Sequence, residues 1–209
     1  MGSSSKRSRR VLLLVGTRKG LFLASSDLDR RKWSVEGPHL AGYEIYHAVL
    51  DPRDCTTAYA AAHHVVWGAH VYRSDDCGRI WAKMPGVPHY DDDDDDDEGT
   101  DRTLKAIWYI GPAHADAPDT VFAGIEPAGL FVSRDRGRSW NAVDGLNHHA
   151  TNKLWQPSGG ALALHSVQVD PRDSRRIYAA ISAGGVYRSD DCGATWTTAN
   201  RGVRADYLP

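Results

Sequence analysis

The stretch Ser189-Asp190-Asp191-Cys192-Gly193-Ala194-Thr195-Trp196 decides the fold, because the chain contains the same pattern twice more. The other copies are Ser74-Asp75-Asp76-Cys77-Gly78-Arg79-Ile80-Trp81 and Ser133-Arg134-Asp135-Arg136-Gly137-Arg138-Ser139-Trp140. All three octets share the pattern Ser-x-Asp-x-Gly-x-x-Trp, and each follows a short strand-like run. Each octet therefore predicts a hairpin turn whose Trp begins the returning strand.

The residue types of the octet suit a turn rather than a reaction. The Asp carboxylate can accept main-chain N–H groups inside the turn, and the Ser hydroxyl does the same more weakly. Gly provides a position with positive φ, and Trp covers the turn with apolar surface. We assign a structural role to the repeated positions, which are Ser74, Asp76, Gly78, Trp81, Ser133, Asp135, Gly137, Trp140, Ser189, Asp191, Gly193 and Trp196.

A longer repeat surrounds each octet. Asp51-Pro52-Arg53-Asp54 recurs as Asp170-Pro171-Arg172-Asp173, and in both copies a Tyr follows eight residues after the first Asp. The Ser residues of successive octets are 59 and 56 residues apart (133 − 74 and 189 − 133). A repeat of this length with four short strand-like segments predicts an all-β fold, a β-propeller of four-stranded antiparallel blades.

The repeat divides the chain into a tail and about four blades. Blade 1 lacks an innermost strand, so either 203–208 seals a four-bladed ring or these blades are the front part of a larger one. We favour a six- or seven-bladed ring because the repeat is long. The expected boundaries are 1–10 for a disordered basic N-terminal tail, 11–36 for an incomplete blade 1, 42–84 for blade 2, 85–103 for an acidic loop, 104–143 for blade 3, 161–199 for blade 4 and 200–209 for the start of the next connection.

Composition limits the classes of function. The chain has 209 residues, 41% apolar and 25% charged, with a net charge of −2, so it is globular and gives no reason to expect nucleic acid or an anionic membrane as a partner. Its longest apolar run, 11–15, is too short to span a bilayer or to serve as a signal peptide. Cys77 and Cys192 occupy the same position in separate turns, which disfavours a disulfide between them. We therefore predict a cytoplasmic location.

The acidic run Asp91 to Asp97 is predicted to be solvated or disordered, because its like charges repel one another. A calcium site is the weaker alternative, since such sites alternate their ligands and include a bend.

Alternating strand direction sorts the turns of a propeller onto two faces. The octets share one face, whereas the turns between second and third strands and the blade-to-blade connections share the other, which we call the variable face. Loops on a rigid scaffold are the usual place for binding and catalytic residues. We therefore expect a functional site on the variable face.

Glu126 and Glu44 are the candidate catalytic residues of the variable face, because glycoside hydrolysis needs two carboxyl groups about 5–5.5 Å or about 6.5–9.5 Å apart. Glu126 has no evident task in its turn, where Gly129 and Pro127 suffice; pairing with a loop cation is the plain alternative. The expected ligand-binding residues are Arg18, Lys19, His63, His64, Trp67, Trp155 and His165.

Each of these ligand-binding assignments has a structural alternative. The histidines can be ordinary solvated or packed residues, and the two tryptophans can cover blade edges instead of stacking on a sugar. The His63-His64 and His148-His149 pairs and His165 could surround a metal, but their spacing matches no metal motif. We therefore predict no metal and no other cofactor.

The octet resembles the Asp-box, or bacterial neuraminidase repeat (BNR), of sialidases, sortilin-type receptors and xyloglucan hydrolases. The stretches 16–22, 126–131 and 155–160 are similar to the bacterial exo-α-sialidase-like or glycosyl-hydrolase-like Asp-box proteins, and this similarity covers most of the chain from Val11 onward. The resemblance implies a β-propeller that acts on or binds a carbohydrate. The alternative is a non-catalytic propeller that binds a protein or another small polar ligand, as sortilin-type and photosystem-assembly propellers do.

The sialidase resemblance does not extend to the catalytic residues of that family. Sialidases hold the substrate carboxylate with three arginines, the first of them in a Phe/Tyr-Arg-Ile-Pro motif that this chain lacks. Arg18 is the nearest analogue, Arg102 is one further candidate, and no third arginine is evident. Whether the chain is an enzyme therefore stays open at the level of the sequence.

Overall fold

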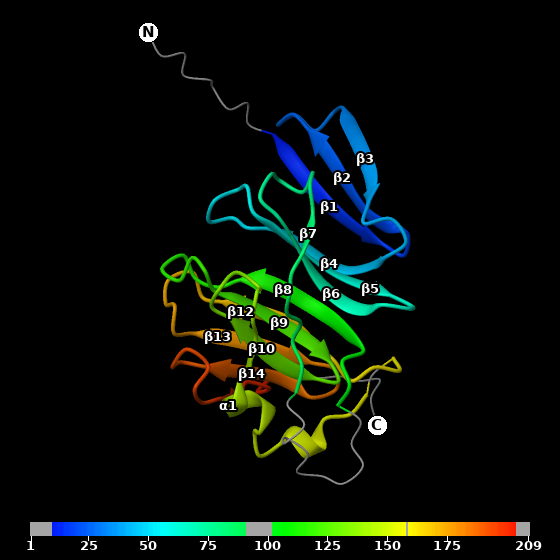
Figure 1. The fold of residues 1–209 in the computed structure, drawn as a ribbon. Helices are drawn as coiled ribbons and strands as arrows, with labels where there is room; N and C mark the ends of the chain where they lie inside the picture. Colours follow the sequence, from blue (N-terminus) through cyan, green and yellow to red (C-terminus); the bar gives the residue numbers. More distant parts are fainter. Residues whose placement is uncertain (1–9, 91–101, 158, 204–209) are drawn as a thin grey trace.

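The computed structural model describes residues 10–90, 102–157 and 159–203, which fold into four antiparallel sheets (Figure 1). This arrangement confirms the predicted all-β partial propeller. The predicted tail over 1–9, the acidic run and most of the segment 203–208 lie outside the described residues.

The fifteen strands of the described residues form four blades. Blade 1 contains β1 (Val11–Thr17), β2 (Gly20–Ser26) and β3 (Trp33–His39), and blade 2 contains β4 (Glu44–Leu50), β5 (Ala58–His64), β6 (Gly68–Ser74) and β7 (Ala82–Lys83). Blade 3 contains β8 (Ala106–Pro112), β9 (Val121–Glu126), β10 (Gly129–Ser133) and β11 (Asn141–Ala142), and blade 4 contains β12 (Leu164–Val169), β13 (Ile177–Ile181), β14 (Gly185–Ser189) and β15 (Thr197–Thr198).

The sheets follow one another in chain order, with blade 1 at one end of the row and blades 2 and 3 between it and blade 4. Three hydrophobic clusters fill the spaces between successive blades. Small residues let the sheets approach closely. At Gly124, for example, an added Cβ would collide with the main-chain oxygen of Leu164 in the next blade. Face-to-face packing of apolar sheets is thus the main stabilising contact of this fold.

The three octets form turns with nearly identical hydrogen bonds, as their sequence predicts. In each, the Ser hydroxyl donates to the Asp carboxylate at 2.7 Å and accepts the Gly N–H at 2.7–2.9 Å. The same carboxylate accepts the N–H of the residue four positions later at 2.9 Å. Positive φ occurs at Gly and also at the residue before it, where the structure has Cys77, Arg136 and Cys192.

The connection 141–161, predicted as a loop, contains a short helix α1 (Asp144–Asn147) and a 3-10 turn η2 (Asn152–Leu154). Leu146 is fully buried, which draws this segment against blade 3. The Asn147 amide accepts the Leu130 N–H at 2.8 Å and donates to the Leu130 carbonyl at 3.1 Å. One side chain thereby pairs with a main-chain edge of β10 in the way a neighbouring strand would.

Candidate functional site

The inner strands of blades 2, 3 and 4 share a β-bulge at the end that meets the variable face. In β4 the residue Tyr46 is skipped in the pairing with β5, between Ile45 and His47. Trp108 in β8 and His165 in β12 are skipped in the same way. A bulge leaves one residue unpaired and redirects its side chain. Three neighbouring blades therefore present a ring side chain at an equivalent position.

Two of these rings meet across the boundary between blades 2 and 3. The ring centroids of Tyr46 and Trp108 are 5.1 Å apart and the rings are inclined at 77°, an edge-to-face geometry that favours aromatic pairs. The Trp108 indole Nε1 donates to Glu126 Oε2 at 2.9 Å. Glu126 ends β9 and pairs with Ala106 at the start of β8, so the sheet itself holds the carboxylate beside the indole.

The second predicted carboxylate, Glu44, lies near Tyr46. Glu44 Oε1 is 3.0 Å from Arg18 Nε, which extends from the β1–β2 hairpin of blade 1. Glu44 lies close enough to Tyr46 for its negative charge to act on the phenol, and His63 pairs opposite Glu44 in β5. We call this group the mouth cluster and define it as Arg18, Glu44, Tyr46, His63, Trp108 and Glu126.

The electrostatics of the mouth cluster keep the Tyr46 phenol protonated. Burial is the largest cause that raises its pKa, followed by the negative charges of Glu44 and Glu126 and the hydrogen bond to Glu44. Arg18 acts in the opposite direction but does not reverse the shift. The Tyr46 phenol therefore stays protonated at neutral pH and keeps its O–H group as a hydrogen-bond donor.

Two further predicted residues, His64 and Trp67, lie in the adjacent β5–β6 hairpin. His64 Nδ1 accepts the main-chain N–H groups of Val66 and Trp67 at 3.1 and 3.3 Å, which fixes the hairpin tip. Trp67 is 66% exposed and its ring centroid is 6.2 Å from that of His64. Val65 and Val66 are exposed beside it, so the tip presents apolar surface to solvent.

The remaining predicted residues lie apart from the mouth cluster or in other roles. Lys19 is exposed beside Arg18, and His165 is exposed on blade 4, with its Nδ1 3.1 Å from Ser166 Oγ. Trp155 differs from the expectation of a sugar-stacking residue. It is 7% exposed and its indole N–H donates to Tyr187 Oη at 2.8 Å, so it belongs to the core between blades 3 and 4.

Sequence reasoning missed Tyr46 and Trp108, which connect the two carboxylates. A signal was present in the sequence. Tyr46 and His165 each stand five residues before the Asp of the repeated Asp-Pro-Arg-Asp motif, at Asp51 and Asp170. Equivalent ring residues in the innermost strand of two blades indicate a common task on one face.

Other features of the described residues compete less well as a site. A cleft of about 590 Å³ lies between blades 3 and 4 on the octet face, but Asp191 and His114 in its lining already bind Thr195 and Asp116 within the scaffold.

The parts of the chain that the structure describes contain no group of three or more His, Cys, Asp or Glu side chains arranged to hold a metal ion. Within these same parts, no helix has the length and apolar character needed to cross a membrane.

Comparison with known proteins relates the chain to propeller-bearing xyloglucanases. No protein-family model matches it. The solved GH74 xyloglucanase from Xanthomonas campestris superposes with a TM-score of 0.59 and 20% identity, over 94% of this chain and 29% of that structure. The Niastella koreensis GH74 enzyme gives a TM-score of 0.54 and 15% identity, over 88% and 29%. These similarities show the fold, a set of propeller blades.

One curated relative shares recognisable sequence with the chain. The oligoxyloglucan-reducing end-specific xyloglucanase of Emericella nidulans is 29% identical over 79 residues, which are 37% of this chain and 9% of that protein. The chain thus spans under a third of the solved relatives and under a tenth of this one.

Proposed function

We propose that this chain is a carbohydrate-binding, glycosyl-hydrolase-like Asp-box propeller whose ligand site is the mouth cluster. The observation that carries the proposal is the aromatic pair of Tyr46 and Trp108, with Glu44 near the first ring and Glu126 bound to the second. Aromatic rings offer a flat apolar surface to the C–H face of a sugar, and carboxylates accept hydrogen bonds from its hydroxyl groups. The similarity to xyloglucanases supports a carbohydrate as the ligand class.

In a hydrolase, Glu126 would be the acid/base candidate and Glu44 the nucleophile candidate. The charges of both carboxylates act on Tyr46, and Arg18 forms an ion pair with Glu44. A sialidase-like activity is the finer form of this hypothesis, in which Arg18 would contact a substrate carboxylate. Arg18 contacts Glu44 through Nε, so its Nη N–H groups would be the donors to that carboxylate.

The test is a glycan-array and hydrolysis screen of the chain with three matched substitutions. Glu126→Gln and Glu44→Gln remove a carboxylate from the mouth cluster, and Glu36→Gln makes the same change at an exposed position of β3. We expect the first two to weaken binding at least tenfold and to abolish any turnover, and the third to do neither. If both mouth variants keep wild-type binding and turnover on every glycan recognised, the proposal fails.

A second candidate function, a protein-binding propeller, rests on a different observation. Val65, Val66 and Trp67 are 90%, 69% and 66% exposed at one hairpin tip. Exposed apolar surface of this kind often marks a protein contact. A pull-down partner lost with Trp67→Ala but kept with Glu126→Gln would favour this function over the carbohydrate site.

A further inference from the structure

The two end blades each present a sheet face that no described residue covers. In blade 1, Leu13 and Val15 are 47% and 43% exposed, and Phe22 is half-buried opposite Val15. These side chains alternate with Leu14 and Leu21, which pack against blade 2. The open face of blade 1 is therefore apolar, although it faces solvent.

The same three positions of blade 3 form one side of the contact between blades 2 and 3. By hairpin register they are Val121, Ala123 and Phe131, since Phe131 pairs with Ala123 as Phe22 pairs with Val15. All three are at most 1% exposed and belong to the cluster that joins the two blades. Blade 1 thus carries the residue types that a blade uses to receive a preceding neighbour.

Blade 4 carries the opposite side of this contact. Blade 2 packs on blade 3 through Tyr59, Ala61 and Val71, which are 1%, 1% and 0% exposed. Blade 4 repeats these three positions on its open face. In blade 4 the repeated residues are only half-buried. The matching pairs are Tyr59 and Tyr178, Ala61 and Ala180, and Val71 and Val186.

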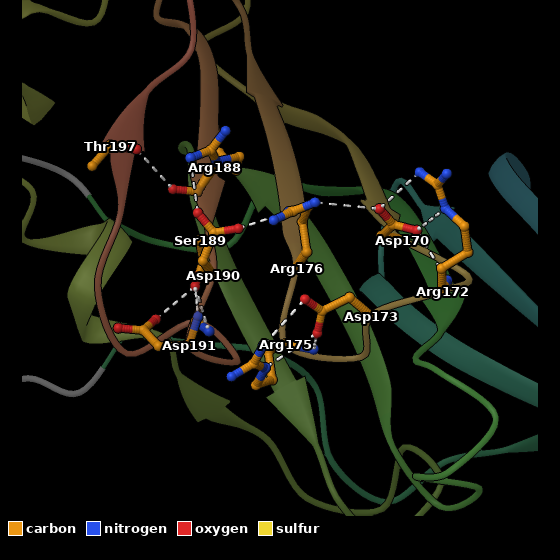
Figure 2. Close-up of polar contacts among 11 residues, drawn as sticks. Asp170, Arg172, Asp173, Arg175, Arg176, Arg188, Ser189, Asp190, Asp191 and Thr197 are labelled. Carbon is orange, nitrogen blue, oxygen red and sulfur yellow. Dashed lines mark hydrogen bonds and ion pairs between the residues drawn. The ribbon is translucent and has the colours of Figure 1, made fainter.

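An arginine at the edge of each of these faces supports the match. Arg53 is held by Asp51 and donates across the blade boundary to the carbonyls of Ala117 and Thr120 at 2.9 and 3.2 Å. Its counterpart in the repeat, Arg172, is held by its own aspartate in the same way (Figure 2). The Arg53 side chain is 11% exposed and that of Arg172 is 86% exposed, so Arg172 keeps its outer N–H groups in solvent.

We propose that the open face of blade 4 binds the open face of blade 1 of a second copy of this chain, head to tail. Each copy carries both halves of a contact that the fold already makes between blades 2 and 3, so a second copy supplies what each end lacks. Arg172 would donate to main-chain carbonyls of β1, which is an edge strand in the described part of the chain. Two copies of about four blades fit the range of closed propellers, which extends to eight blades. The proposal does not depend on any ligand.

The experiment is sedimentation velocity of the 209-residue chain over a range of concentrations. We expect a species of twice the 23.0 kDa chain mass that dissociates on dilution. Val15→Arg and Tyr178→Asp each place a charge on one of the two faces and should weaken association at least tenfold. Val65→Arg makes the first change at an exposed hairpin tip and should leave association unchanged. Arg172→Ala removes only an exposed side chain, so it should weaken association without affecting folding.

Mixing the two charge variants distinguishes head-to-tail association, in which blade 4 of one copy contacts blade 1 of the other, from association through the same face of both copies. The Val15→Arg chain keeps an intact blade 4 face and the Tyr178→Asp chain keeps an intact blade 1 face, so an equimolar mixture should regain a dimer with one intact contact. Circular dichroism melts of the variants verify that each is folded. A wild-type chain that stays monomeric at every concentration, as it would if these faces serve other blades, overturns the proposal. A Val15→Arg chain that associates like wild type does so as well.

Discussion

Replacing the buried Ser of one octet isolates the free energy that the turn contributes to folding. Ser133 is 0% exposed, and its Oγ accepts the buried N–H of Gly137 at 2.7 Å while donating to Asp135 at 2.7 Å. In Ser133→Ala the Gly137 N–H loses its acceptor, which costs about 1–3 kcal/mol. Asp135 keeps its hydrogen bonds from Arg138 and Ser139, so we expect the free energy of unfolding to fall by about 2 kcal/mol. For a chain of this size, that corresponds to a fall of about 4–8 °C in Tm.

The matched control is Ser139→Ala, which removes the other hydroxyl bound to the same carboxylate. Ser139 is exposed, and water can replace its hydrogen bond to Asp135 Oδ2, so we expect a loss below about 1 kcal/mol. Urea and thermal unfolding followed by circular dichroism measure both variants. Equal destabilisation by the two substitutions would refute the view that satisfying the buried N–H group is the main task of the octet Ser.

Three further predictions concern stability. Hydrogen bonds from Thr195 hold the pKa of Asp191 at about 2, and hydrogen bonds from the turn lower that of Asp135 to about 2 despite its partial burial. In the unfolded chain the pKa of an Asp carboxyl is about 4, so folding lowers both pKa values. The two carboxylates therefore contribute their full stabilisation above pH ~4, and this contribution is lost as the pH falls through about 2. A urea midpoint that stays constant from pH 5 to 2 would contradict this. Asn147→Ala should lower the free energy of unfolding by about 1–3 kcal/mol, because it leaves the buried Leu130 N–H unpaired, whereas the Leu130 carbonyl keeps the Val143 N–H at 3.0 Å; a urea titration showing a loss under about 0.5 kcal/mol would count against the strand-like pairing. Trp155→Phe should lower Tm through loss of the bond to Tyr187 while leaving glycan binding unchanged, and weaker binding at constant Tm would return Trp155 to the ligand site.

The sequence predicts the blades because the octet turns depend on local interactions. Ser189 and Asp191 bind groups within their own turn, so their spacing alone specifies the structure. Trp155 could not be placed in this way, since its partner Tyr187 lies 32 residues later in another blade. The contact between Tyr46 and Trp108 depends likewise on two blades meeting, and no local pattern specifies that geometry.

The two ends of the strands have different roles: the octet turns stabilise single hairpins, and the opposite end carries the proposed site. At the octet end blades 2, 3 and 4 each satisfy the hydrogen bonds of their own turn, so the three turns are alike and any one of them stabilises its own hairpin. At the mouth end no blade completes the site alone, because Arg18 comes from blade 1, Glu44 and Tyr46 from blade 2, and Trp108 and Glu126 from blade 3. The geometry of the proposed site therefore depends on the spacing between blades, which the packed apolar faces set. A substitution within an octet should change stability and spare binding, whereas one that alters the contact between blades 2 and 3 should change both.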